Sequence, residues 1–312
     1  MKFALTLLTA LVVAAQPRFA AAPLVPFRTL PLFPEETAGG VWSNGAFLLV
    51  RNSGSNAPLL QAYDRQGKLL QASTFRIAGA VLINIYPGRF SRATDGTWGV
   101  SGSAYTNDSR AAVFAGWLSP DGTRQTVIRT SPYVPAALTF APDGTIWTAG
   151  FEREAGRALR SDHAIVRHFD RMGRVLSSAI LRSSIPSNTH PAAESRLLVS
   201  RDRLGWISYT ANIYVELSFD GRELGRYDVK VPPKTQINGT GICGDNSLWA
   251  SLTAEGGQRP LRLVRLERTG HSLLPTPSIE PGGYLYGCDE ASSLVLGVKQ
   301  SVIWIRPAIA PR

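Results

Sequence analysis

The chain has 312 residues, 44% of them apolar and 18% charged, with a formal net charge of +10. This composition excludes a disordered chain and provides enough apolar residues for a large core. The 28 Arg and 5 Lys residues are scattered without basic runs, which argues against nucleic acid as a partner and leaves anionic envelope polymers open.

The N-terminal residues are predicted to be a secretory signal peptide. Met1 and Lys2 precede a mostly apolar run over residues 3–15, and small residues follow. This run is too short for a transmembrane helix, and no later segment reaches the required length. We expect cleavage after Ala15 or Ala22, a single domain over residues 23–312, and a monomeric protein located in a periplasm or secreted.

A hairpin pattern recurs along the rest of the chain. In residues 140–150, "FAPDGTIWTAG", a Pro-Asp-Gly turn separates two apolar runs. Related stretches cover residues 39–52, 90–102, 198–210, 241–253 and 285–298. A tryptophan often follows the turn, as at Trp98, Trp147, Trp206 and Trp249.

A second type of hairpin alternates with the first. Its polar turns end in glycine, at Gly67, Gly122, Gly173, Gly221 and Gly270. Glycine suits these turns because one residue often needs a positive φ. Two hairpins make a four-stranded unit, and the unit repeats at a mean interval of 49 residues. Four-stranded units at this interval are typical of β-propeller blades.

The sixth unit lacks a fourth strand, because the chain ends soon after a predicted strand at residues 302–306. The segment 24–33, "LVPFRTLPLF", has no partner of its own and could supply that strand. Pairing the two chain ends would remove exposed sheet edges. The sequence therefore predicts an all-β, six-bladed propeller closed by an N-terminal strand, with seven blades as the alternative.

The turn motifs carry a family resemblance. Residues 135–150, "PAALTFAPDGTIWTAG", and residues 165–176, "IVRHFDRMGRVL", resemble NHL repeats, and the whole chain is similar to six-bladed, TolB-like propellers. The Val-Ala-Asp usual in NHL repeats is replaced here by Thr148, Ala149 and Gly150. The resemblance implies a propeller, a fold that supports many activities.

The resemblance also implies that the glycine-rich turns share one face, whereas long, varied loops occupy the other. Such loops on a rigid scaffold commonly carry binding sites. We expect a ligand site around the channel mouth on the loop face. The candidate residues are Asn84, Tyr86, Arg89, Tyr105, Asn188, His190, Asn238, Tyr284 and Tyr286.

Few residues suggest catalysis. His163 and His168 lie five apart on a predicted strand and face opposite sides, so they make a poor metal pair. His190 and Glu194 could supply acid–base groups. By comparison with gluconolactonase-like propellers, Asn188 and Asn238, with Glu194 or Glu280, could hold a divalent metal such as calcium.

Cys243 and Cys288 occupy nearly equivalent places in neighbouring repeats. A disulfide suits an oxidising compartment, and two buried thiols are the other interpretation. The leading functional prediction is a non-enzymatic propeller that needs no cofactor and binds a protein partner, a small ligand or an envelope polymer. The alternative is a lactonase-like hydrolase or lyase with a site in the central channel.

Overall fold

The computed structural model describes residues 29–31, 40–108, 110–153, 160–186, 195–254, 262–279, 282–298 and 301–306. The predicted signal peptide, residues 1–22, lies outside these ranges. The regular secondary structure of the described residues consists of β-strands and one short 3-10 helix, η2 (Arg182–Ser184). They contain no helix with the length and apolar character needed to cross a bilayer.

The strands form four sheets of four strands and one sheet of eight. The first sheet contains β2 (Val41–Ser43), β3 (Ala46–Arg51), β4 (Leu59–Tyr63) and β5 (Leu69–Thr74). The second contains β6 (Leu82–Arg92), β7 (Trp98–Tyr105), β8 (Ala111–Leu118) and β9 (Gln125–Arg129). The third contains β10 (Tyr133–Phe140), β11 (Ile146–Glu152), β12 (Ala164–Phe169) and β13 (Val175–Leu181).

The eight-stranded sheet consists of two antiparallel sets of four. One set is β14 (Ser195–Val199), β15 (Leu204–Ser208), β16 (Ile213–Leu217) and β17 (Glu223–Val229). The other is β18 (Thr235–Ile242), β19 (Leu248–Ala254), β20 (Arg262–Thr269) and β21 (Ser272–Pro275). The outer strands β17 and β21 join the sets through a parallel pairing of two residue pairs. The structure thus merges two units that the sequence predicts as separate.

The last sheet combines both ends of the chain. It contains β22 (Tyr284–Cys288), β23 (Leu294–Val298), β24 (Ser301–Ile305) and the N-terminal β1 (Thr29–Pro31). β1 pairs antiparallel with β24, with Thr29 opposite Ile303. This pairing agrees with the predicted closure for residues 29–31, and the rest of the segment 24–33 lies outside the described residues.

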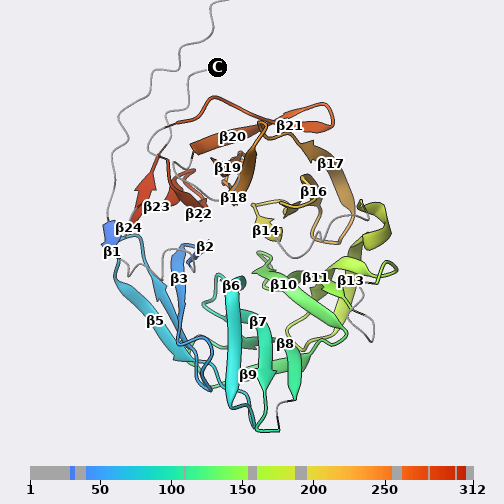
Figure 1. Cartoon of the computed structure of the whole chain (residues 1–312). Helices are drawn as coiled ribbons and strands as arrows, with labels where there is room; N and C mark the ends of the chain where they lie inside the picture. Colours follow the sequence, from blue (N-terminus) through green and yellow to red (C-terminus); the bar gives the residue numbers. More distant parts are fainter. Residues whose placement is uncertain are drawn as a thin grey trace, which may run out of the picture.

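The sheets stand radially around a common centre, as Figure 1 shows. The strands nearest the centre are β2, β6, β10, β14, β18 and β22. Apolar clusters fill the spaces between neighbouring sheets: Leu48 and Leu60 of the first sheet pack with Trp98 and Phe114 of the second. The first and last sheets meet in the same way, through a cluster that includes Phe47 and Trp304.

The repeated turns have one chemical design. The Asp143 carboxylate accepts a hydrogen bond from the backbone N–H of Thr145 at 2.9 Å, and Asp95 accepts one from Thr97 at 2.9 Å. Gly144 adopts a φ of +81°, which is favourable only for residues without a Cβ. The Asp-Gly pairs therefore reverse the chain between the two inner strands of these sheets.

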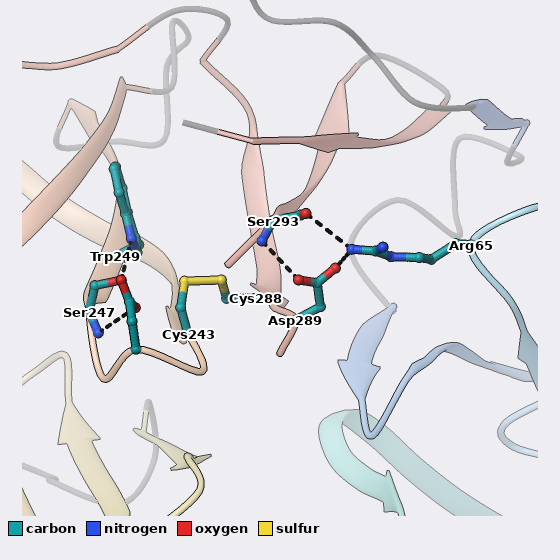
Figure 2. Close-up of a disulfide and its surroundings, with 8 residues drawn as sticks. Arg65, Cys243, Ser247, Trp249, Cys288, Asp289 and Ser293 are labelled. Carbon is teal, nitrogen blue, oxygen red and sulfur yellow. Dashed lines mark hydrogen bonds and ion pairs between the residues drawn. A yellow bond between two sulfur atoms is a disulfide. The ribbon is translucent and has the colours of Figure 1, made fainter. Parts of the chain in front are cut away.

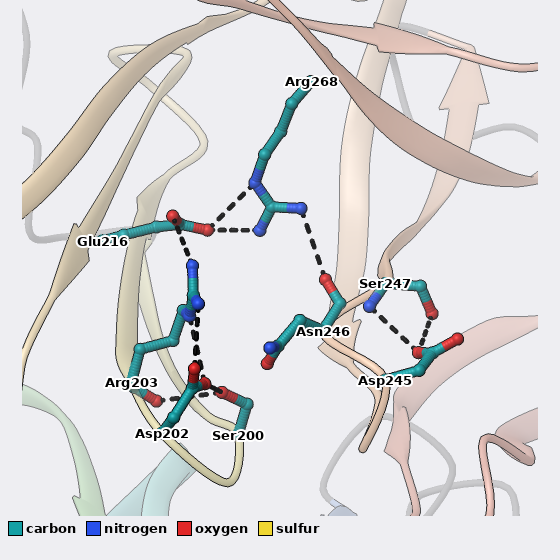
Figure 3. A network of polar contacts seen from close by, with 8 residues as sticks. All are labelled: Ser200, Asp202, Arg203, Glu216, Asp245, Asn246, Ser247 and Arg268. Atoms are coloured by element: carbon teal, nitrogen blue, oxygen red, sulfur yellow. Dashed lines mark hydrogen bonds and ion pairs between the residues drawn. The ribbon is translucent and has the colours of Figure 1, made fainter.

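An ion-pair network ties the two halves of the eight-stranded sheet together (Figure 3). Glu216 on β16 is buried and accepts hydrogen bonds from Arg203 Nη1 and from Arg268 Nε, each at 3.1 Å. Arg268 lies on β20 and also donates to the backbone carbonyl of Asn246 at 3.3 Å. A carboxylate of one half thus holds an arginine of the other.

Candidate functional site

Two cavities lie among the inner strands and share part of their lining. The first, here the mouth cavity, has a volume of about 580 Å³ and is lined by residues near the starts of the inner strands. The second, here the turn-side cavity, has a volume of about 310 Å³ and extends to the inner turns at Asn44, Pro142 and Glu290. Gly88 and Arg196 line both cavities, so they mark the junction.

Five inner strands and one turn surround the mouth cavity. Its lining residues are Tyr86, Gly88, Arg89, Ala136, Ser195, Arg196, Tyr209, Thr210, Gln236, Ile237, Asn238 and Tyr284. Two of these residues are cationic, three are tyrosines, and none is a carboxylate.

Bulges aim several inner-strand residues at the centre. The pairing of β6 with β7 is interrupted between Ile85 and Phe90, which leaves Tyr86 to Arg89 outside the ladder. Gly88, in this bulge, has a φ of +75°. Shorter interruptions of strand pairing leave Ala136 on β10 and Asn238 on β18 unpaired in their ladders. Because bulges redirect side chains, they place residues in the cavity that regular pairing would not.

Four of the residues expected from the sequence lie together in the mouth cavity: Tyr86, Arg89, Asn238 and Tyr284. A fifth, Tyr286, lines the turn-side cavity instead. It also lies in an interruption of its strand, and its ring contacts that of Tyr284 with centroids 5.0 Å apart.

Two of the expected residues line neither cavity. Asn84 is paired with Ser103 of β7 before the bulge begins, and its Oδ1 lies beside Gly54 of the neighbouring sheet. Tyr105 ends the second strand of its sheet, opposite Leu82. The sequence placed both near the mouth, but neither side chain lines a cavity. Asn188, His190, Glu194 and Glu280 lie outside the described residues.

Arg89 lies over an aromatic ring at the rim. Its guanidinium carbon is 4.7 Å from the centroid of the Tyr86 ring, and Tyr86 is 44% exposed. Burial lowers the pKa of Arg89, and the Tyr86 phenol partly opposes this effect. An arginine remains charged at physiological pH despite such a shift. Arg89 therefore places a positive charge in the lining of the mouth cavity.

Arg196 lies deeper and has tyrosines around it. It donates a hydrogen bond to Tyr284 Oη, and its guanidinium carbon is 5.6 Å from the centroid of the same ring. Burial alone would lower the pKa of Arg196, but the phenols of Tyr284, Tyr209 and Tyr286 outweigh it and the pKa is raised. The junction of the two cavities therefore carries a permanent positive charge.

Tyr209 closes one side of the cavity. Its hydroxyl lies 2.8 Å from Thr240 Oγ1, and burial raises the pKa of the phenol to about 12. Burial also raises the pKa of Tyr286 above its usual value. Both phenols are therefore neutral at physiological pH and do not offset the charge of Arg196.

Arg196 and Tyr209 were missed from the sequence. The segment around Arg196 reads as an ordinary strand, and Tyr209 follows the second strand of its unit. A signal for Arg196 does exist. Aligning the repeats on their turn aspartates places five residues at similar positions, five to seven residues before the aspartate: Arg89, Ala136, Arg196, Asn238 and Tyr284.

The histidines form no metal centre with the described residues, where no group of three His, Cys, Asp or Glu side chains could hold a metal ion. His163 Nε2 accepts a hydrogen bond from the backbone N–H of Glu152 at 3.3 Å. His168 stacks on Trp147 with ring centroids 4.1 Å apart. These two side chains thus belong to the packing of the third sheet.

A disulfide joins Cys243 and Cys288 at the edge of the turn-side cavity, with Cα atoms 4.9 Å apart (Figure 2). It links the ends of β18 and β22. Next to it, Asp289 forms an ion pair with Arg65 from the β4–β5 turn and accepts a hydrogen bond from Ser293 N at 2.8 Å. Covalent and ionic links therefore run from the eight-stranded sheet through the last sheet to the first.

Solved structures share this architecture. Hydrazine synthase from Kuenenia stuttgartiensis, a propeller-type protein, is similar with a TM-score of 0.50 and 14% identity over 85% of this chain and 74% of that chain. The fold is of the propeller type. Glucose dehydrogenase gives a TM-score of 0.46 and 12% identity over 90% and 100% of the two chains. Puromycin hydrolase gives a TM-score of 0.48 and 14% identity over 88% of this chain and 47% of that chain.

No family model matches the sequence, and no curated protein does. The likeness to hydrazine synthase, with 14% identity, shows the propeller fold alone, and that fold supports many activities. The functional argument therefore rests on the residues of this chain.

Proposed function

We propose that this chain is an exported, six-bladed β-propeller that binds a ligand in the mouth cavity. The observation that carries the proposal is the convergence of Tyr86, Arg89, Asn238 and Tyr284 on one cavity. These residues come from three inner strands, and bulges direct three of them inward. Cavities of this size with a few placed polar groups are typical small-molecule sites.

The division into six blades is supported by the pairing of β17 with β21. It contains two parallel residue pairs, whereas the strands inside each half of the eight-stranded sheet are antiparallel neighbours. A contact between the outer edges of two adjacent blades would have this form. Counting each half as a blade gives six four-stranded units, in keeping with the resemblance to NHL and TolB-like propellers.

Export is supported by two features. The apolar run at residues 3–15 suits a signal peptide, and the Cys243–Cys288 disulfide suits an oxidising compartment. The ligand would then be a molecule that reaches the periplasm or the surroundings of the cell.

Blocking the mouth tests the proposal. Gln236 is exposed at the rim, and a tryptophan there would fill the entrance. Wild-type protein, Gln236→Trp and the control Gln66→Trp, in the exposed β4–β5 turn, would be screened by thermal shift against a library of metabolites and saccharides. We expect ligands that raise the Tm of the wild type and of Gln66→Trp but not of Gln236→Trp.

Mass spectrometry of each ligand after incubation separates binding from catalysis, because a bound ligand is recovered unchanged and a substrate is converted. The proposal is wrong if no compound stabilises the wild type, or if every stabilising compound acts equally on Gln236→Trp.

A further inference from the structure

We infer that the ligand of the mouth cavity carries an oxyanion, a carboxylate or phosphate, which Arg196 and Arg89 bind, on a small hydroxylated body. This inference rests on the proposed function and adds the chemical class of the ligand. Four observations carry it: the charge of the lining, the surroundings of Arg196, its depth and the polar groups at the rim.

The lining of the mouth cavity has a net positive charge. Its two ionised side chains are Arg89 and Arg196, and no Asp or Glu lines it among the residues that the structure describes. The turn-side cavity differs, because its lining contains Asp289 and Glu290 as well as Arg196 and Arg201. Low-dielectric walls around charges of one sign attract the opposite charge, so the mouth cavity favours an anion.

The guanidinium of Arg196 has no carboxylate partner within the described ranges. Three partly buried arginines elsewhere do have one: Arg167 pairs with Glu152, and Arg203 and Arg268 pair with Glu216. Arg196 contacts tyrosines instead, and the high pKa values of Tyr209 and Tyr286 keep those phenols neutral. Arg196 is half-buried. A partly desolvated charge is costly unless it is paired, and an oxyanion from the ligand would pair it.

The position of Arg196 gives the ligand an orientation. Arg196 lines both cavities, whereas Arg89 lines the mouth cavity alone and lies over the exposed Tyr86 ring. An oxyanion on Arg196 would thus be at the deep end, with the rest of the ligand toward the loops. A planar guanidinium binds carboxylate or phosphate through two parallel hydrogen bonds, which fixes this orientation.

The groups nearer the rim suit a polar body. The amides of Gln236 and Asn238 offer both donors and acceptors, and the rings of Tyr86 and Tyr284 supply apolar surface. This mixture fits a ring that carries hydroxyl groups on its edge. A sugar acid and a sugar phosphate share that chemistry, and both can be tested directly.

Isothermal titration calorimetry of the mature protein would use three probes: D-glucuronate, D-glucose 6-phosphate and neutral D-glucose. The variants are Arg196→Met, Arg89→Met and the control Arg201→Met, which removes the same charge from an exposed position on the turn-side cavity. Because charge-assisted hydrogen bonds are strong, we expect glucose to bind at least about 10-fold more weakly than one or both anions.

Arg196→Met should weaken binding of the anion by about 10-fold or more, and Arg89→Met should weaken it less, because Arg89 is at the rim. Arg201→Met should leave the Kd within about twofold of the wild type. If Arg196→Met does not fold, Arg89→Met carries the test, with a loss of about threefold or more expected. Preference for glucuronate or for glucose 6-phosphate identifies carboxylate or phosphate as the recognised group.

The inference is overturned if neither anion binds at millimolar concentration, if glucose binds as well as both, or if the arginine variants bind anions as the wild type does. Failure of the proposed function looks different, because the library screen then yields no ligand that Gln236→Trp excludes. If the only ligands that Gln236→Trp excludes are neutral, the proposed function is supported and the inference that the ligand carries an oxyanion is wrong.

Discussion

At the scale of single residues, buried charges determine which side chains are structural and which are available to a ligand. Glu216 is 2% exposed and has arginines on both sides, Arg203 and Arg268. Its charge is therefore satisfied inside the protein. Arg196 is half-buried, has Tyr284, Tyr209 and Tyr286 near it, and lines the two cavities. The first arrangement stabilises the fold, and the second is the basis of the proposed site.

Removing the charge of Glu216 should destabilise the protein strongly. Glu216→Gln leaves two arginines without their common counterion, and we expect the free energy of unfolding to fall by about 3 kcal/mol. The matched control is Glu223→Gln, because Glu223 is more exposed and pairs with Arg226 on the surface, where a loss of at most about 1 kcal/mol is expected. Urea denaturation measures both values, and equal losses would contradict the structural role of Glu216.

Two buried histidines should make stability depend on pH. Burial lowers the pKa of His163 and of His168, although Glu152 and Asp143 respectively oppose the effect. The unfolded chain then binds protons more readily, so their contribution is complete above the unfolded pKa of about 6.5 and is lost as pH falls through the folded values. The free energy of unfolding should therefore decrease between about pH 7 and about pH 5.

His168→Phe tests this dependence, because a phenylalanine ring keeps the stack on Trp147 but does not titrate. We expect a smaller decrease of stability on acidification than in the wild type. His271→Phe is the control, since His271 is exposed in the β20–β21 turn, and it should leave the dependence on pH nearly unchanged. An identical decrease in His168→Phe and the wild type would refute the assignment to His168.

At the scale of elements, the chain ends complete one sheet. β1 pairs with β24, and the apolar cluster of Phe47, Tyr286 and Trp304 joins the last sheet to the first. The Arg65–Asp289 ion pair spans the same junction. Without β1, the edge of β24 would expose unpaired backbone groups, which favours aggregation.

Removing residues 24–33 from the mature chain should lower the free energy of unfolding by about 3 kcal/mol, at roughly 1 kcal/mol for each lost backbone hydrogen bond, and should promote aggregation. Deleting residues 307–312 is the control, because it leaves every described strand intact. Thermal unfolding and light scattering measure the two effects. A soluble truncation that melts at the wild-type temperature would contradict the role of β1.

At the scale of the whole molecule, periodic features were predictable and irregular ones were not. The Asp-Gly turns revealed the hairpins because a carboxylate and a glycine satisfy each reversal locally. The parallel contact between β17 and β21 was not predicted, since it depends on how two outer edges meet in space. The sequence therefore predicted the order of the strands better than the boundaries of the sheets.

The candidate site was predictable in part for a similar reason. Tyr86, Arg89, Asn238 and Tyr284 were expected because they precede or begin inner strands. Asn84 was expected near an inner strand and Tyr105 in a loop of the same face, but both are paired in the β6–β7 ladder and line neither cavity. The bulges that place Tyr86, Arg89 and Asn238 in the cavity depend on the pairing register, and a local sign of the first bulge is Gly88 with its positive φ.

The most direct test of the whole account is a crystal structure of the mature protein grown with D-glucuronate or D-glucose 6-phosphate. The account predicts six four-stranded blades, with the anionic group of the ligand within hydrogen-bond distance of the Arg196 guanidinium in the mouth cavity. A ligand bound with its anion away from both Arg196 and Arg89, or no ligand in the mouth cavity, would contradict it.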